Sequence, residues 1–324
     1  MSILDGRSVL ITGGTGSFGK RFVKTILDET EVRRVAIFSR DELKQYEMQQ
    51  AYPNEPRLRF FLGDVRDRAR LDRAFFDIDF VIHAAALKQV PAAEYNPFEA
   101  VKTNIHGAQN VIDSAIERGV ERVVALSTDK ACSPVNLYGA TKLVSDKLFV
   151  NGNAYASGTR TRFSVVRYGN VVGSRGSVVP YFEQQRATGV LPITDERMTR
   201  FWITLDQGVR FVLDSLERMH GGELYVPKIP SMRVVDLAKA MAPDAELRIV
   251  GVRPGEKLHE EMISVSDARS TLDVGDRYVI QPELDFWPKP DLDGTPMPDG
   301  FSYASDTNDR WLTVDELRTM VADA

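Results

Sequence analysis

Two periods of hydrophobic and polar positions alternate along the first half of the chain. Short β-branched runs such as RSVLIT and DFVIHAA predict buried strands, and the longer amphipathic segments between them predict helices. Strands that alternate with helices in this way are typical of a parallel sheet covered by helices on both faces. The expected strands are 7–12, 32–38, 58–63, 79–85 and 121–128, and the expected helices are 18–28, 41–50, 67–76, 97–118 and 138–156.

The alternation weakens after residue 170, where Gly, Pro and Arg interrupt shorter elements. We therefore expect an α/β fold, with a Rossmann-like, doubly wound parallel sheet over residues 1–170 and a smaller α/β lobe over 171–324. Residues 204–219 predict another helix and 221–227 another strand, so we expect 203–226 to return to the main sheet. The smaller lobe is then discontinuous in sequence.

Charge and composition exclude several classes of protein. The 324 residues include 41 basic and 46 acidic side chains, intermixed to a net charge of -5, which offers no footprint for nucleic acid. The apolar runs fall short of the roughly 20 residues that a membrane-spanning helix needs. The lone Cys132 cannot form an intramolecular disulfide and no basic-then-apolar leader precedes the first strand, so we expect a cytoplasmic protein. The histidines lack ligand spacing, so no metal is expected.

A glycine-rich loop, TGGTGSFG, follows the first expected strand and opens the first expected helix. Glycines without a Cβ let the backbone approach a pyrophosphate, and the helix N-terminus offers unpaired N–H groups. A plain tight turn is the alternative, but the strand before the loop and the helix after it favour dinucleotide binding. The candidate residues are Gly13, Thr15, Gly16, Ser17, Phe18 and Gly19.

The end of the second strand bears on the choice of nucleotide. An NAD site usually offers an acid to the ribose 2′-hydroxyl there, whereas this chain has Ser39 and Arg40. Arg40 and Lys44 suit a 2′-phosphate and favour NADP over NAD; the alternative is a solvated helix start capped by Asp41. Other cofactor contacts are expected after the third and fourth strands, where His83 is expected to be a core residue. They are Asp64, Val65, Ala84, Ala85 and Ala86.

The stretch STDKACSPVNLYGATK, residues 127–142, gathers groups that move protons. Tyr138 and Lys142 stand four apart on an expected helix and share a face. A free phenol has a pKa of roughly 10, and a nearby ammonium and an oxidised nicotinamide both lower it, so we expect Tyr138 to act as a base. Thr128 is expected to hydrogen-bond the same substrate hydroxyl. A buried tyrosine beside a surface lysine is the alternative interpretation.

The glycine loop, with Thr128, Tyr138 and Lys142, resembles an extended short-chain dehydrogenase/reductase over nearly the whole chain. Asp129 and Lys130 add the acid and the base that removal of water from a sugar requires. The chain is most similar in its motifs to the inverting UDP-N-acetylglucosamine 4,6-dehydratases of the pseudaminic-acid pathway, whereas the retaining enzymes carry Asp-Glu in place of Asp-Lys. The motifs are STDKA…YGATK, SRDELK, ALKQVP, RYGNVVGSRGSVVP, MTRFWIT and RPGEKLHE.

The resemblance implies an NADP-dependent lyase. Tyr138, helped by Thr128 and Lys142, takes the sugar O4 proton while hydride leaves C4. Lys130 removes the C5 proton, provided that its pKa is lowered, and protonated Asp129 gives a proton to the departing C6 hydroxyl. Hydride then returns to C6 and C5 is reprotonated on the opposite face. The alternative for the Asp-Lys pair is a solvated ion pair that contributes little.

The smaller lobe is expected to hold a UDP-sugar, whose diphosphate needs cations. The resemblance implies substrate contacts at Lys88, Asn170, Arg175, Thr194, Arg200, Arg253 and Glu256. It also implies that Thr103 and Asn104 lie under the nicotinamide, with a structural bridge as the alternative for Asn104. Members of the family assemble into dimers and hexamers, and their product leads to a flagellar glycan.

Two other functions stay open. A UDP-sugar 4-epimerase uses the same fold, cofactor and tyrosine without loss of water, and Asp129 and Lys130 argue against it. A non-catalytic NADP-binding regulator would keep the glycines but has no use for a complete set of proton-transfer groups.

Overall fold

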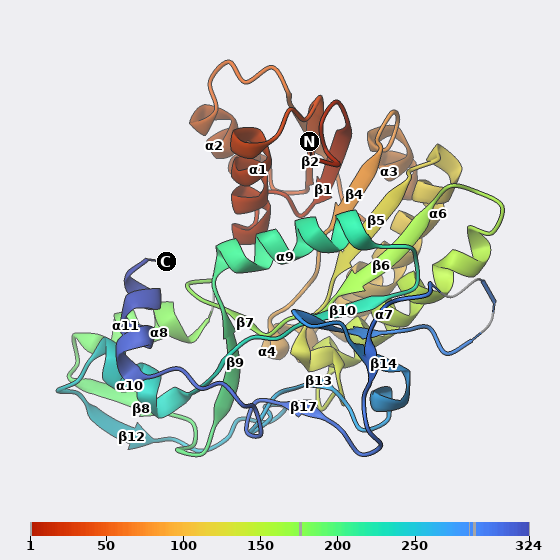
Figure 1. The fold of residues 1–324 in the computed structure, drawn as a ribbon. Helices are drawn as coiled ribbons and strands as arrows, with labels where there is room; N and C mark the ends of the chain where they lie inside the picture. Colours follow the sequence, from red (N-terminus) through yellow and green to blue (C-terminus); the bar gives the residue numbers. More distant parts are fainter. Residues whose placement is uncertain (1, 175–176, 285, 288–289, 324) are drawn as a thin grey trace.

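A mostly parallel sheet forms the centre of the larger lobe (Figure 1). The computed structural model describes residues 2–174, 177–284, 286–287 and 290–323, and within them the sheet has ten strands in the order β16-β14-β15-β10-β6-β5-β4-β1-β2-β3. The strands are β1 (Ser8–Thr12), β2 (Arg34–Ser39), β3 (Leu58–Leu62), β4 (Phe80–His83), β5 (Arg122–Leu126), β6 (Arg162–Val166), β10 (Leu224–Pro227), β14 (Thr271–Asp273), β15 (Arg277–Ile280) and β16 (Thr295–Pro296).

The strand directions confirm the predicted fold class. All neighbouring pairs from β3 to β10 are parallel, and β15, β14 and β16 follow as an antiparallel extension. Every residue of β1 is buried, as a strand covered on both faces requires. The β-branched runs that predicted β1 to β5 therefore form the middle and one side of a doubly wound sheet.

Helices cover both faces of this sheet, and Figure 1 shows α9 in front of the strands and α6 and α7 behind them. α1 packs against α9, α3 against α6, and α6 against α7. The helices of the larger lobe are α1 (Ser17–Glu29), α2 (Glu42–Ala51), α3 (Arg68–Ala74), α4 (Val90–Tyr95), α5 (Pro97–Val101), α6 (Gly107–Arg118), α7 (Leu137–Tyr155) and α9 (Leu205–Arg218).

The helix predicted over 97–118 is interrupted. Between α5 and α6 lies one turn of π-helix, η1 (Lys102–His106), which holds Thr103 and Asn104. A π-turn inserts a residue and rotates the face that follows it, and such turns are frequent at functional sites. Hydrophobic periodicity over 22 residues does not resolve one inserted residue, so the sequence predicted a continuous helix.

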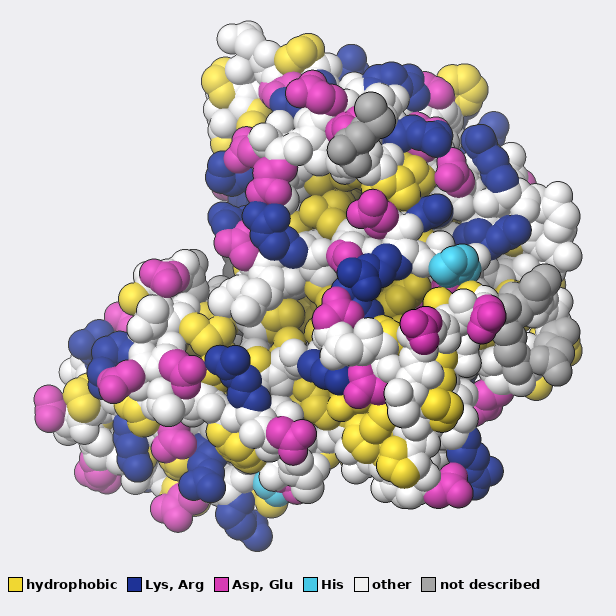
Figure 2. Space-filling view, viewed as in Figure 1, with side chains coloured by type: hydrophobic (Ala, Val, Ile, Leu, Met, Phe, Trp, Pro, Cys, Tyr) yellow, Lys and Arg dark blue, Asp and Glu magenta, His cyan; other side chains and the backbone are white. Residues whose placement is uncertain are grey.

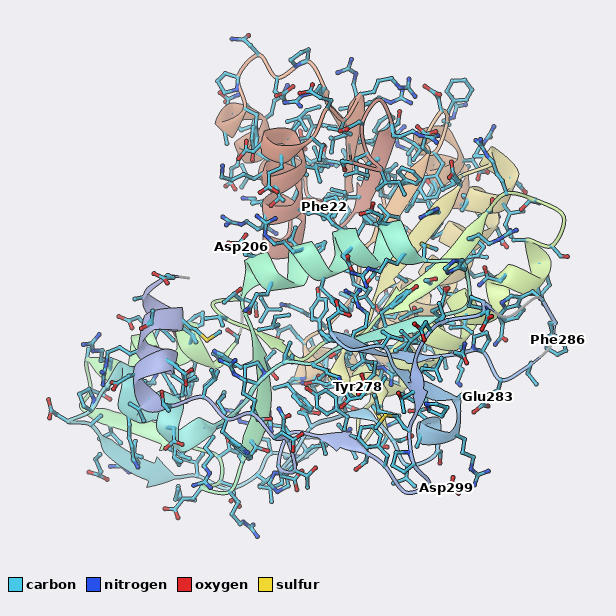
Figure 3. All side chains as sticks on the ribbon, viewed as in Figure 1. Phe22, Asp206, Tyr278, Glu283, Phe286 and Asp299 are labelled. Carbon is cyan, nitrogen blue, oxygen red and sulfur yellow. The ribbon has the colours of Figure 1, made fainter. Side chains whose placement is uncertain are left out.

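α9 and β10 bring the chain back to the main sheet. β10 pairs in parallel with β6, and Figure 3 shows Asp206 at the start of α9 close to α1, which carries Phe22. The Arg21 guanidinium forms an ion pair with Asp206 and joins the two helices. Residues 271–280, assigned from the sequence to the smaller lobe, form β14 and β15 at the edge of the main sheet.

A second hydrophobic core lies in the smaller lobe, at the lower left of Figure 1. It centres on Trp202, Leu191 and Leu237, which are fully buried. The elements around it are β7 (Asn170–Val171), α8 (Val178–Arg186), β8 (Val190–Ile193), β9 (Thr199–Ile203), β11 (Ser231–Arg233), α10 (Val234–Met241), β12 (Glu246–Ile249) and α11 (Val314–Ala322). A two-stranded ladder of β13 (Glu261–Ile263) and β17 (Tyr303–Ala304) adds Met262, Ile263 and Tyr303 to the core of the larger lobe.

Basic and acidic side chains intermix over the face of the molecule seen in Figure 2, in keeping with their mixture along the sequence. None of the helices in the described part of the chain has both the length and the apolar character needed to cross a membrane.

Candidate active site

One large cavity, of about 660 Å³, lies along the carboxyl ends of the parallel strands. In doubly wound sheets this edge is where ligands bind. The predicted site residues that line it are Gly13, Thr15, Gly16, Ser17, Phe18, Gly19, Ser39, Arg40, Lys44, Asp64, Val65, Ala84, Ala85, Ala86, Lys88, Thr103, Thr128, Asp129, Lys130, Tyr138, Lys142 and Asn170. Fold and sequence motif thus bring both halves of the predicted site into one cavity.

The glycine loop is shaped for close approach. Gly13 has a φ of +67°, and a Cβ there would lie 3.0 Å from the Ala85 Cα. A Cβ on Gly19 would lie 2.3 Å from the Gly14 carbonyl oxygen, so helix α1 packs on the loop only because the position is glycine. At Gly16 the sole protein neighbour would be the Gly13 carbonyl, at 3.2 Å. Gly16 is the N-cap residue of α1, and Ser17, Phe18 and Gly19 line the cavity, so a helix N-terminus borders it, which fits a dinucleotide pyrophosphate.

The two cations after β2 both line the cavity, and both have acidic neighbours. Arg40 is 56% exposed and its Nη1 lies 3.7 Å from an Asp64 oxygen. Lys44 pairs with Asp41, whose carboxylate also caps α2 by accepting from the Lys44 backbone N–H at 3.0 Å. The sequence left two alternatives here: a helix start capped by Asp41, or two cations that suit a 2′-phosphate. The structure has the cap, and it also has both cations in the cavity lining.

His83 and Asn104 are structural in this arrangement. His83 is buried, and its Nδ1 lies 2.8 Å from the Thr12 hydroxyl. Asn104 accepts from the Leu87 N–H at 2.8 Å and donates to the Leu87 carbonyl and the Thr141 hydroxyl, both at 3.0 Å. Asn104 does not belong to the cavity lining among the described residues, and its hydrogen bonds tie the loop after β4 to helix α7.

The proton-transfer groups come from two adjacent elements. Thr128 ends the segment after β5, and Asp129 and Lys130 form the one-turn helix η2 (Asp129–Ala131). The Thr128 hydroxyl donates to Asp129 Oδ1 at 2.9 Å, and Lys130 Nζ lies 3.1 Å from the same oxygen. Tyr138 and Lys142 lie on α7, which packs against η2. The five predicted catalytic residues therefore share one wall of the cavity.

Lys130 is held between two carboxylates. Its Nζ lies 3.1 Å from Asp129 and 3.0 Å from Glu260, and both acids are almost fully buried. Burial by itself would lower the pKa of Lys130, but the two negative charges outweigh burial and raise the pKa above its ordinary value. The role of Lys130 as a base was made conditional on a lowered pKa, and this structure does not meet that condition, because the sequence did not reveal Glu260 as a neighbour.

Burial raises the pKa of Tyr138 to about 12, since the charge of Lys130 and the neighbouring Thr128 hydroxyl offset only part of the desolvation. Burial also lowers the pKa of the Lys142 ammonium, and the Asp146 carboxylate one turn further along α7 opposes that shift. The expectation that Tyr138 acts as a base also rested on a bound oxidised nicotinamide and stays a prediction; among the described residues, burial outweighs the charge of Lys130.

The predicted substrate residues are only partly assembled. Lys88 and Asn170 line the cavity; desolvation lowers the pKa of Lys88, and the buried Asn170 Oδ1 has no hydrogen-bond partner among the described residues. Arg175 lies outside the described residues. The lining drawn from the described residues leaves out Thr194, Arg200, Arg253 and Glu256.

Arg200 and Arg253 differ in their surroundings. The Arg200 guanidinium is largely buried and donates to the backbone carbonyls of Lys257 and Leu258, both at 3.1 Å. Arg253 is 58% exposed and its Nη1 lies 3.7 Å from Glu256. Arg200 thus holds the RPGEK loop, residues 253–257, from its buried side, while Arg253 lies on the exposed side of that loop.

Several cavity and support residues were not predicted. Gln89, Ser127, Tyr168, Ser174, Ser177 and Leu205 line the cavity. Behind the wall, Asp146 accepts from the Ser127 hydroxyl at 2.7 Å and from Arg167 at 3.1 Å. The motif letters RYGN and RPGEKLHE contain Arg167 and Glu260, but a motif identifies the residue and not the partner that it meets in the fold.

Comparison with known proteins agrees with this site. The family model described as polysaccharide biosynthesis protein matches residues 9–282. A Campylobacter jejuni protein named UDP-N-acetylglucosamine 4,6-dehydratase (inverting) is 56% identical over 330 residues, which span 98% of each chain. A Rickettsia canadensis protein named UDP-glucose 4-epimerase is 42% identical over 282 residues, 85% of this chain and 82% of that protein.

Solved structures share the fold. The crystal structure of Pen from Bacillus thuringiensis superposes with a TM-score of 0.91 at 35% identity and covers 99% of this chain and 98% of its own. DesIV, a dTDP-glucose 4,6-dehydratase from Streptomyces venezuelae with NAD bound, has a TM-score of 0.70 at 24% identity over 78% of this chain and 86% of its own. With the motifs and the cavity, these matches confirm the predicted resemblance: the chain belongs to the polysaccharide biosynthesis protein family and is an extended short-chain dehydrogenase/reductase.

Proposed function

We propose that this protein is a UDP-N-acetylglucosamine 4,6-dehydratase that inverts C5 and forms UDP-2-acetamido-2,6-dideoxy-β-L-arabino-hexos-4-ulose. The observation that carries the proposal is the contact of 3.1 Å between Lys130 Nζ and Asp129 Oδ1 in the cavity that also holds Tyr138. Oxidation at C4 needs only the tyrosine set, whereas loss of water needs a further acid and base. The 56% identity to a protein of that name supports the same function.

The cofactor is NADP, with NAD as the alternative. The glycine loop fits a pyrophosphate, and Arg40 and Lys44 supply two cations at the position of a ribose 2′-phosphate. The acidic neighbours Asp41 and Asp64 offset part of that charge, so the binding constants of both nucleotides decide the preference. When bound, the nicotinamide takes the hydride from C4 and returns it to C6.

Tyr138 takes the proton of the O4 hydroxyl. Thr128 lies beside it, and the nearby Lys130 charge and a bound oxidised nicotinamide would together favour the phenolate against the burial that raises its pKa. Lys142, buried one helical turn away on the same face of α7, directs a third polar group to the same end of the cavity. Asn170, with its free amide oxygen, faces the sugar from the opposite lobe and accepts from an N–H such as that of an acetamido group.

The acid and the base for water loss arise from one ion pair. A proton moves from Lys130 Nζ to Asp129 Oδ1, which leaves a neutral amine and a carboxylic acid. The amine takes the C5 proton, the electrons of that C–H bond form the C5–C6 double bond, and the C6–O bond breaks. The Asp129 proton leaves with the oxygen as water, and C5 is later reprotonated on the opposite face. The proton stays within the pair, and because the two carboxylates raise the pKa of Lys130, the neutral amine is a minor form that the reaction draws on.

NMR of UDP-N-acetylglucosamine incubated with the purified protein and NADP in deuterated water tests this function. A dehydratase gives a new C6 methyl group and deuterium at C5. A C4 epimer that retains its C6 hydroxyl would instead identify a UDP-sugar 4-epimerase, the function named for the Rickettsia relative. An unchanged substrate would point to a non-catalytic NADP-binding regulator.

Lys130→Ala is the variant that tests the assignment of the base. The variant should neither release water nor exchange the C5 proton for deuterium, while Lys147→Ala, on the exposed face of α7, should behave like the wild type. A Lys130→Ala protein that eliminates water at the wild-type rate and still washes deuterium into C5 would show that another residue is the base.

Three finer assignments accompany this function. The reaction belongs in the cytoplasm, where a chain with the single Cys132 needs no disulfide. The protein acts as a homo-oligomer, a dimer or a hexamer, which light scattering on the purified protein measures. Its product enters the pseudaminic-acid pathway for flagellin glycosylation, so an aminotransferase specific for the C4 ketone should consume it.

A further inference from the structure

Glu260 is a buried acid that contacts the site residue Lys130 from outside the cavity. It is 2% exposed, it directly precedes β13, and it stands 130 residues after Lys130 in the chain. Its Oε1 lies 3.0 Å from Lys130 Nζ, yet Glu260 is outside the cavity lining among the described residues. A substrate in the cavity would therefore meet Lys130 and not Glu260.

The backbone of Glu260 is fixed on both sides. Its N–H donates to the Ser305 hydroxyl at 2.9 Å, and its carbonyl accepts from the Ser305 N–H at 2.8 Å. Arg200 Nε lies 3.8 Å from Oε1 and Lys257 Nζ lies 4.0 Å from Oε2, but Oε2 has no hydrogen-bond partner in the described structure. The shortest contact of this carboxylate to a cation is the one to Lys130.

We propose that Glu260 is a positioning residue that, together with Asp129, orients the Lys130 amine so that its lone pair faces the sugar. The inference rests on the proposed dehydratase function and deepens it. A neutral amine has two N–H donors and one lone pair. Once its proton has moved to Asp129 Oδ1, the Lys130 amine keeps Glu260 at 3.0 Å as the carboxylate that accepts one of its N–H groups, and this bond sets the rotation of the amine and the direction of its lone pair.

A purely structural role for this carboxylate is poorly supported by the surrounding contacts. The loop before Glu260 has other anchors, because Arg200 donates to the carbonyls of Lys257 and Leu258 and Lys257 Nζ donates to the Cys132 carbonyl at 2.5 Å. Burial of a carboxylate costs free energy unless a charged partner compensates it. The loop is already fixed by hydrogen bonds to its backbone and does not need the Glu260 carboxylate. Lys130, in contrast, is fixed by its contact with that carboxylate.

The test compares Glu260→Gln with the matched control Glu261→Gln in the pH dependence of kcat. The charged and titratable groups around Lys130 are Asp129 on η2, Tyr138 on α7, Arg200 on β9 and Glu260. Loss of the Glu260 charge removes a group that favours the Lys130 ammonium and therefore lowers the pKa of Lys130. The fall of kcat at high pH, where this ammonium loses its proton, should then move to lower pH by about one unit or more. kcat should fall about 10- to 100-fold through misorientation, with KM changed less than about threefold.

Glu261→Gln is the control because the Glu261 carboxylate accepts from the Ser133 hydroxyl at 2.7 Å and lies on the same segment. It should keep kcat within about twofold and leave both limbs of the profile in place. A Glu260→Gln enzyme with the wild-type pH profile, or one that loses only thermal stability, would overturn the positioning role.

If Glu260→Gln fails to fold, the wild-type protein decides the question by nitrogen-15 NMR of Lys130. A Lys130 ammonium that titrates at or below the pKa of an ordinary lysine would overturn the inference, and one that stays protonated above it supports the contact. A wild-type protein that releases no water from the substrate refutes the proposed function itself. Wild-type activity with an unaffected Glu260→Gln refutes the positioning role alone.

Discussion

Asn136 and Gly255 connect the helix that carries Tyr138 to the RPGEK loop. The Asn136 side-chain amide donates to the Gly255 carbonyl at 2.8 Å, while its oxygen accepts from the Gly139 N–H at 2.8 Å and caps α7. Gly255 has a φ of +79°, a conformation that favours glycine, and a Cβ there would lie 3.2 Å from the Asn136 Cβ. One side chain thus fixes both the start of α7 and the loop that is expected to hold the nucleotide.

Two variants of Asn136 should separate these tasks. Asn136→Asp keeps the cap acceptor but puts a carboxylate oxygen where the amide donated to the Gly255 carbonyl, so the loop should move and KM for the UDP-sugar should rise. Asn136→Ala loses both bonds and should also lower the free energy of unfolding by about 1 kcal/mol. Steady-state kinetics and urea unfolding measure the two quantities. Equal unfolding free energies for the two variants would mean that the cap contributes nothing.

Gly16→Ala should fold normally and lose cofactor affinity. Gly16 has φ -73° and ψ 173°, which alanine adopts freely, and the added methyl group would lie 3.2 Å from the Gly13 carbonyl oxygen, which must shift by a few tenths of an ångström. The methyl group then occupies the wall where a pyrophosphate approaches, so Kd for NADP should rise about tenfold or more. Isothermal titration measures Kd. Gly208→Ala within α9 is the control, since its Cβ meets nothing within 4 Å, and its NADP affinity should stay unchanged.

Arg40→Ala should weaken NADP binding and spare NAD. A guanidinium that contacts the 2′-phosphate contributes a charge-assisted hydrogen bond, so its loss should raise Kd for NADP by about 10- to 100-fold. Kd for NAD should stay within about twofold. Arg59→Ala is the control, because Arg59 on β3 is exposed and donates only to nearby carbonyls. Equal losses for both nucleotides would place Arg40 elsewhere than at the 2′ position.

His83 should make the protein sensitive to acid. Burial and the Lys142 charge lower the pKa of His83 to about 3, whereas an unfolded histidine titrates near 6.5. The unfolded chain therefore takes up this proton first, and stability falls as the pH drops from about 6.5 toward about 3. In urea unfolding across that window, the free energy of unfolding of the wild type should fall by about 1.4 kcal/mol more per pH unit than that of His83→Asn. Identical slopes would show that His83 does not stay neutral in the folded protein.

The succession of strands and helices in the first half of the chain and most of the cavity wall could be predicted from the sequence because both depend on local patterns. β-branched runs marked β1 to β5, and the glycines, Thr128 and Tyr138 follow strand ends or begin helices, so the sheet brings them together at one edge. Most residues of the cavity lining could therefore be predicted without any long-range contact other than the pairing of the parallel strands.

The rest depends on contacts between distant segments. Glu260 meets Lys130 only because the chain folds back through β13, and no local pattern records that meeting. The π-turn η1, which contains Thr103 and Asn104, inserts one residue into an otherwise regular helical pattern. The placement of Arg200 beneath the RPGEK loop, and of β14 and β15 on the main sheet, likewise follows from tertiary packing.

One edge of the ten-stranded sheet ends at β16, whose two residues are Thr295 and Pro296. A proline has no N–H to offer to a further strand, and so short a strand presents little backbone to a neighbour. The protein thereby blocks strand-by-strand addition from this side, which lowers the tendency of a large sheet to aggregate when many copies accumulate in a crowded cell.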